Sequence, residues 1–190
     1  MNRTIVLLAF IAISLISCNE TPNPKPDAYF RLTFPEHEYQ RYSSDECPYT
    51  FDYPVYAKIN NDEDYGHKPC WLNIDLSQYK AHIHITLKEI NNNLDSLLDD
   101  SHTLVYKHTV KADAIEAKDY FDDSLKVYAT IFFIEGNAAS PMQFHITDSV
   151  NYMFRGSLYF KVAPNSDSLA PAVDFLKVDV MHLIESFEWK

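Results

Sequence analysis

Glycine is nearly absent from this chain, with three residues in 190. Phosphate-binding loops need clustered glycines, because their backbone turns sharply and approaches the phosphate closely. This scarcity excludes P-loops and dinucleotide-binding fingerprints. The sequence also lacks a nucleophile elbow and an H-E-x-x-H zinc motif. With no local signature of catalysis, we expect the protein not to be an enzyme.

Basic residues are scarce as well. The chain has 16 Lys and Arg against 27 Asp and Glu, which gives a formal net charge of -11. An acidic surface repels phosphate backbones and gains nothing from counterion release, so we expect no nucleic-acid partner. The same charge gives no attraction to anionic lipid. Any membrane attachment must therefore have another source.

Long apolar runs are limited to one, residues 5–16, which follows the basic Arg3. The run is too short to span a bilayer, so it predicts an export signal rather than an anchor helix. Leu15-Ile16-Ser17-Cys18 fits the lipobox of bacterial lipoproteins, which are cut before an acylated cysteine. We predict a lipoprotein signal peptide over residues 1–17 and covalent lipid on Cys18. Each buried acyl CH2 contributes about 0.8 kcal/mol to membrane binding.

The residues after Cys18 are typical of a tether. Residues 18–27 contain three prolines among small polar residues and predict an extended segment. Residues 28–190 show no internal repeat and predict one globular domain. Asn19-Glu20-Thr21 lacks the Lys-then-acidic pattern of surface export, so we expect a cell-envelope protein facing the periplasm, on the inner or the outer membrane.

Cysteine is also rare, with three residues in the chain. If Cys18 carries lipid, Cys47 and Cys70 remain, and an even pair outside the cytoplasm predicts a disulfide. Closing a loop of about 24 residues contributes roughly 3 kcal/mol in the chain-entropy model. The alternative is a metal or redox pair, which the absence of a C-x-x-C motif disfavours.

Hydrophobic periodicity predicts strands, a helix, more strands and a final helix. The expected strands are Ala28–Phe34, Tyr49–Tyr53, Trp71–Leu76, Ala81–Leu87, Val127–Ile134, Phe144–Thr147 and Tyr152–Val162. The first helix begins after Asn92 or Asn93, with Leu94, Leu97, Leu98, Leu104 and Val105 as its apolar stripe. The second begins near Ser168, with Pro171 in its first turn and a stripe of Val173, Leu176, Val180, Leu183, Ile184 and Phe187.

This order predicts an α+β domain, in which a mainly antiparallel sheet is packed by two amphipathic helices. Cys47–Pro54 and Ile184–Trp189 loosely resemble the edges of PsbP/Mog1-like domains. That resemblance implies a fold and says little about function.

Histidines suggest one possible metal site. His82 and His84 share a face of a predicted strand, and imidazoles at i and i+2 can both reach one ion. His145, on another strand, could be a third ligand. The alternative is solvated histidines on the polar face of a half-buried sheet, and we expect no cofactor beyond the lipid on Cys18.

Two features suggest a surface that binds a partner protein. One is the small-residue run Gly136, Asn137, Ala138, Ala139 and Ser140, which lets another chain approach closely or simply forms a roomy turn. The other is the outward face of the sheet. Tyr128, Phe132 and Tyr159 would project from it beside the histidines, unless the N-terminal segment covers it.

Several segments together resemble one known family. They are lipobox Cys18, Cys47-Pro48, Cys70-Trp71-Leu72-Asn73-Ile74-Asp75, Asn91-Asn92-Asn93-Leu94-Asp95-Ser96-Leu97-Leu98, Tyr106-Lys107-His108-Thr109, Gly136-Asn137-Ala138-Ala139-Ser140 and Gly156-Ser157-Leu158-Tyr159-Phe160. In this order, over essentially the whole mature chain, they resemble the gliding motility lipoprotein GldD family of Bacteroidetes.

The resemblance implies a non-enzymatic lipoprotein required for movement over surfaces and linked to the type IX secretion machinery. It implies partners among the envelope proteins of that machinery, including the membrane protein GldE. It supplies no catalytic residues. The alternative function is an envelope enzyme, or a metal- or ligand-binding lipoprotein, that uses the face carrying His82 and His84.

Overall fold

The computed structural model describes residues 32–61, 68 and 70–190. The predicted signal peptide, Cys18, the tether and most of the predicted strand Ala28–Phe34 lie outside the described residues. Residues 32–34 are described and are not part of a strand, so the prediction is wrong there. No helix among the described residues is long and apolar enough to cross a membrane.

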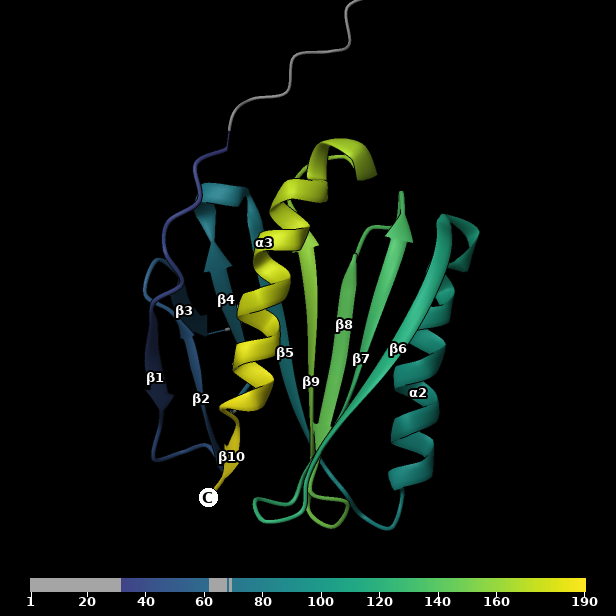
Figure 1. Cartoon of the computed structure of the whole chain (residues 1–190). Helices are drawn as coiled ribbons and strands as arrows, with labels where there is room; N and C mark the ends of the chain where they lie inside the picture. The colour runs from purple at the N-terminus through teal and green to yellow at the C-terminus, as the bar shows by residue number, and fades with distance from the viewer. Residues whose placement is uncertain (1–31, 62–67, 69) are drawn as a thin grey trace, which may run out of the picture. The chain divides into compact units, whose positions relative to one another are not determined.

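The described chain forms two antiparallel sheets and two α-helices (Figure 1). The strands are β1 (Tyr39–Ser43), β2 (Tyr49–Pro54), β3 (Lys58–Asn61), β4 (Leu72–Leu76), β5 (Ala81–Glu89), β6 (Ala112–Asp122), β7 (Val127–Gly136), β8 (Met142–Thr147), β9 (Tyr152–Phe160) and β10 (Glu188–Trp189). The helices are α2 (Leu94–Tyr106) and α3 (Ser166–Glu185), with 3-10 turns η1 (Ser77–Tyr79) and η2 (Lys107–Val110). The predicted α+β class is confirmed.

The larger sheet has the strand order β3-β4-β5-β9-β8-β7-β6, and β1-β2-β10 form the smaller one. Alternation along β7 shows that the two helices cover opposite faces of the larger sheet. Ile131 belongs to the main core with Leu176 and Leu183 of α3. Phe132, the next residue, packs with Val105 of α2 in a second, smaller core. The sheet is therefore a middle layer between α3 and α2.

An asparagine precedes each α-helix, but only Asn165 caps its helix with its side chain. Asn165 precedes α3, and its Oδ1 accepts a hydrogen bond from the Ser168 backbone 3.2 Å away. The helix therefore begins at Ser166, two residues before the predicted start, and Pro171 lies in its second turn. Asn93 precedes α2, but its Oδ1 accepts from the Asn91 backbone instead of capping the helix.

The predicted apolar stripes are largely correct. In α3, Leu176, Val180, Leu183 and Ile184 are buried. In α2, Leu97 and Val105 are buried, whereas Leu104 is 38% exposed. The helix buries Ser101 instead, whose hydroxyl lies 3.2 Å from the His145 Nδ1 of the sheet.

A disulfide joins the smaller sheet to the loop before β4. Cys47 and Cys70 are bonded, with their Cα atoms 5.4 Å apart and a sequence separation of 23. Nearby, the Tyr49 hydroxyl donates to the Cys70 carbonyl at 2.9 Å. The pair that the cysteine count favoured is therefore bonded in the structure, and it fixes the start of β2 to the start of β4.

Candidate partner-binding groove

One face of the larger sheet carries polar side chains, as predicted, but α2 covers part of this face. Pairing aligns Phe132 with Gln143 on β8, and Gln143 with Ser157 on β9, so these side chains share the face that packs on α2. Phe132 is 2% exposed and His145 4%. The expectation that Phe132 is an exposed partner-binding residue is wrong, because Phe132 packs against Val105 of α2.

The three candidate metal ligands are not brought together as a ligand set. His82 and His84 lie on β5 and His145 lies on β8, with β9 between them. The His84 Nδ1 is 3.0 Å from the Asn73 Oδ1, and the His82 ring stacks on Tyr159. In the part of the chain that the structure describes, no three His, Cys, Asp or Glu residues form a group that could hold a metal ion.

The His145 side chain is buried away from solvent. Its Nδ1 lies 3.2 Å from the buried Ser101 hydroxyl of α2. Burial, together with the nearby His102 and Arg155, lowers the pKa of His145 to about 4. The imidazole is therefore neutral in the folded protein at neutral pH, and it is packed as a core residue.

This lowered pKa predicts acid sensitivity. In the unfolded chain His145 takes up a proton near its ordinary pKa of about 6.5, whereas the folded protein resists protonation down to about pH 4. The free energy of unfolding should therefore fall as the pH drops through this window, by about 2–3 kcal/mol from this residue. Urea denaturation at several pH values should show a shallower decline for His145→Asn than for the wild type. Equal declines would mean that the His145 imidazole is not shielded from solvent in the folded protein.

The small-residue run at the end of β7 is mostly used inside the fold. Gly136 has a φ of +95°, and a Cβ there would lie 2.8 Å from the Asp113 backbone nitrogen, so glycine is required. Ser140 is fully buried, so the prediction that it contacts a partner at the surface is wrong. Ala138 is 7% exposed and borders a groove. Asn137 and Ala139 are exposed, and the Asn137 Oδ1 accepts from the Ser166 backbone at 2.9 Å.

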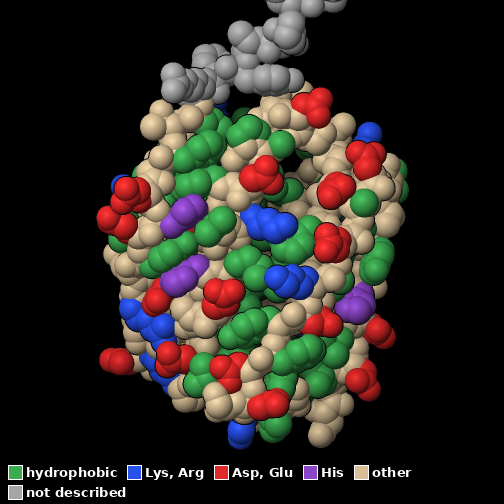
Figure 2. All heavy atoms as spheres, in the orientation of Figure 1, with side chains coloured by type: hydrophobic (Ala, Val, Ile, Leu, Met, Phe, Trp, Pro, Cys, Tyr) green, Lys and Arg blue, Asp and Glu red, His purple; other side chains and the backbone are tan. Residues whose placement is uncertain are grey.

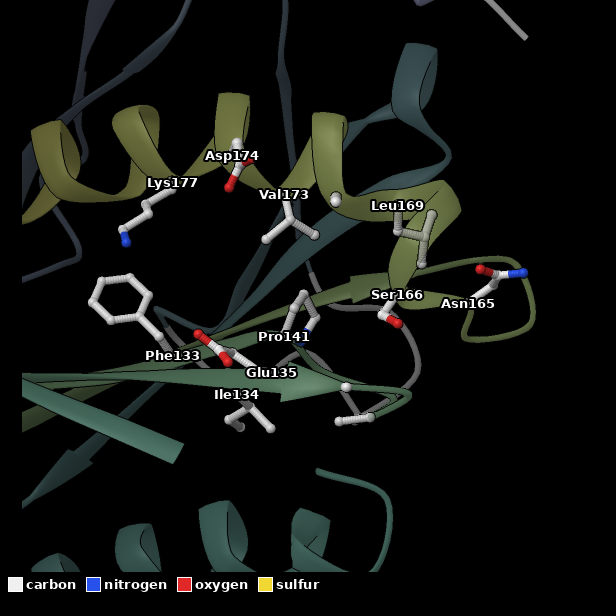
Figure 3. Close-up of a pocket in the computed structure, with 13 residues that line it drawn as sticks. Phe133, Ile134, Glu135, Pro141, Asn165, Ser166, Leu169, Val173, Asp174 and Lys177 are labelled. Atoms are coloured by element: carbon white, nitrogen blue, oxygen red, sulfur yellow. The ribbon is translucent and has the colours of Figure 1, made fainter. Parts of the chain in front are cut away.

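That hydrogen bond fixes the run against the start of α3, and a groove of about 220 Å³ opens between them. Figure 3 shows Leu169 and Val173 pointing from α3 towards the strand that carries Phe133, with Pro141 between the two walls. Gly136 and Ala138 complete the strand side of the groove. The lining is mainly apolar, and Ala170 of α3 lines it while being exposed.

Charged side chains line the same groove. Glu135 lies on the strand side, and Asp174 and Lys177 lie on α3. The Lys177 ammonium lies 4.0 Å from the centre of the Phe133 ring, a cation–π distance. Acidic side chains are scattered over this side of the domain, with fewer basic ones and hydrophobic side chains between them (Figure 2). An apolar groove with charges of both signs suits an apolar side chain carried on a polar peptide segment.

The remaining predicted residues lie elsewhere. Tyr128 is half-buried near the other end of β7, where its ring is 6.5 Å from that of Phe121. Tyr159 lines a different cavity, under α2. Leu169, Ala170 and Lys177 were not predicted as site residues. Their amphipathic pattern indicated a helix but gave no sign that this part of α3 stands away from the sheet.

Comparison with known proteins gives the fold and the family. The solution structure of cyanobacterial PsbP (CyanoP) from Synechocystis sp. PCC 6803 is similar, with a TM-score of 0.52 and 15% identity over 87% of this chain and 100% of that one. At this identity the likeness shows the fold alone, and it confirms the PsbP-like prediction.

No curated protein matches the chain. The family model described as "Gliding motility lipoprotein GldD" matches residues 19–189. The chain therefore belongs to the gliding motility lipoprotein GldD family.

Proposed function

We propose that this protein is a lipid-anchored, non-enzymatic assembly factor of the gliding and type IX secretion machinery. The family match over residues 19–189 carries the proposal, because it makes the chain a gliding motility lipoprotein. The anchor is the lipid on Cys18, and the domain faces the periplasm. The protein uses no cofactor and no nucleic acid.

The groove between α3 and the end of β7 is the site at which we propose that it holds its partner. The partner is an envelope protein of the machinery, with GldE as the first candidate. The apolar walls at Leu169, Val173 and Pro141 would receive an apolar side chain. Asp174, Lys177 and Glu135 would contact the polar flanks of the partner segment.

Filling the groove should abolish function without unfolding the domain. Ala170→Trp places a large ring in the groove from an exposed position of α3, so the core is undisturbed. We expect a deletion strain complemented with this variant to lose colony spreading and adhesin secretion. The melting temperature of the variant should match that of the wild type. Cys18→Ala should fail in the same assay, because it removes the anchor.

The matched control is Ala117→Trp, the same substitution at an exposed alanine of β6 outside the groove. It should restore spreading and secretion fully. Full rescue by Ala170→Trp would remove the groove from the mechanism. Normal spreading and secretion in the deletion strain would contradict the proposed function itself.

A further inference from the structure

Arg155 is a cation in an unusual position. It lies in the middle of β9, between His145 of β8 and Thr86 of β5, on the sheet face that α2 covers. Its Nη2 donates to the Gln143 side-chain oxygen, which is a neutral acceptor. Its Nε is buried and has no hydrogen-bond partner among the residues that the structure describes. A buried donor without an acceptor costs free energy, so this arrangement needs an explanation.

Arg155 also has no acidic partner among residues 32–61, 68 and 70–190. Arg41 shows the usual arrangement, since its guanidinium contacts Asp52 at 3.1 Å and Glu188 at 2.7 Å. In a chain with 27 acidic residues, a shielded guanidinium is expected to bind one of them. The positive charge of Arg155 acts on two nearby histidines. Together with burial, it lowers the pKa of His145 and of His108.

The guanidinium lines a cavity of about 290 Å³ between α2 and the sheet. Trp71, Leu97 and Leu104 give the cavity apolar walls, and Tyr159 and Ser101 add hydroxyl groups. The acid that lines it, Asp100, is 3.7 Å from the Lys88 ammonium and is largely exposed. This volume is close to the lower end of the range for small-molecule sites, about 300 Å³.

We propose that this cavity binds a small organic anion with an apolar body. The charged group accepts hydrogen bonds from Arg155, and the apolar body lies against Trp71 and Leu104. A carboxylate or a phosphate supplies the acceptor oxygens that the guanidinium lacks. The site is separate from the α3 groove, and it does not depend on the proposed function.

Three probes that share a hexyl chain test the proposal: heptanoate, hexyl phosphate and hexanol. Calorimetry would measure their binding to the full-length lipoprotein in detergent micelles, with titrations into empty micelles subtracted. We expect at least one anion to bind with a Kd below about 1 mM and hexanol to bind about tenfold more weakly or worse. The tighter of the two anions identifies the head group as carboxylate or phosphate.

Two variants locate the site. Arg155→Met should weaken binding of the anion about tenfold or more, because it removes the charged donors. Leu104→Trp should block the cavity from an exposed position and leave Arg155 intact, so it tests the site even if Arg155→Met does not fold. Leu125→Trp is the matched control, since Leu125 is 41% exposed and Leu104 38%. Equal binding of hexanol and the anions, unchanged binding in Leu104→Trp, or no anion binding to the wild type would overturn the proposal.

Discussion

A valine at Gly156 is expected to destabilise the domain by about 3 kcal/mol or more. Gly156 lies on β9 in the middle of the larger sheet, paired with Ile85 on one side and Phe144 on the other. A Cβ at this position would overlap the ring of Phe144. Phe144 is 1% exposed and packs near Phe154, so the ring has no free space to enter. Small domains have about 5–15 kcal/mol of stability in total, so the loss would be severe.

A double-mutant cycle would show that the ring is the cause. Gly156→Ala should be destabilising alone, and Phe144→Ala should also be destabilising, because it leaves a cavity. Combined, the new methyl group occupies space that the ring has left. The two costs should therefore fall short of their sum by about 0.5–3 kcal/mol in urea denaturation. Simple additivity, or a Gly156→Val variant as stable as the wild type, would mean that the ring does not pack on this glycine.

The elements that the sequence predicted well are those with strong periodicity. On β5, Ala81, Ile83 and Ile85 alternate with polar residues, and all three are buried as expected. The apolar spacing of α3 likewise matched one face of a helix that packs on the sheet. In both cases one side of the element packs on the core and the other does not. The spacing of the apolar residues therefore predicts both the type of element and its buried face.

The strands that were missed are edge or very short strands. β6 is one of the two edge strands of the larger sheet, and most of its residues are exposed. Glu116, Lys118 and Asp119 lie in its middle, as is common for an edge that must not pair with other chains. Neither face of β6 is apolar enough to give a period of two. β1, β3 and β10 were missed too, and each has five residues or fewer.

The candidate site was only half predictable. The run from Gly136 to Ser140 drew attention by its composition, and two of its residues, Gly136 and Ala138, line one wall of the groove. The other wall comes from Leu169 and Val173, which follow Ala138 by more than 30 residues in the sequence. A groove depends on the distance between two elements, which no local pattern encodes. For the same reason the sequence did not show that α2 covers Phe132.

A buried carboxylate attaches the first described residues of the domain to α3. Asp179 is 3% exposed and lies on the side of α3 that faces β1. It is 2.7 Å from the His37 Nδ1, and it accepts from the hydroxyls of Tyr39, at 3.1 Å, and of Tyr56. Ring stacking of His37 on Phe175 adds to the contact. Because the predicted tether leads from Cys18 to this part of the chain, the cluster connects the proposed anchor to the domain.

Asp179→Ala is therefore expected to cost about 3 kcal/mol, since it leaves several donors without their acceptor. Hydrogen exchange should also speed up in residues 37–43, which the cluster holds in place. Burial and Asp179 together raise the pKa of Tyr39 and Tyr56 above the ordinary value of 10.0. Their hydroxyls contribute stability that is complete below about pH 10 and is lost as the pH rises towards the folded-state pKa values. The variant should lose less stability than the wild type over that alkaline range.

The control is Asp174→Ala, which removes an exposed carboxylate from the same helix and should change stability by less than about 0.5 kcal/mol. Because Asp174 lines the groove, the two variants also separate anchoring from partner binding. Asp179→Ala should release residues 37–43 and leave the groove residues Leu169 and Val173 protected from exchange. If exchange instead rises uniformly through both segments, Asp179 supports the whole core rather than the junction with the tether.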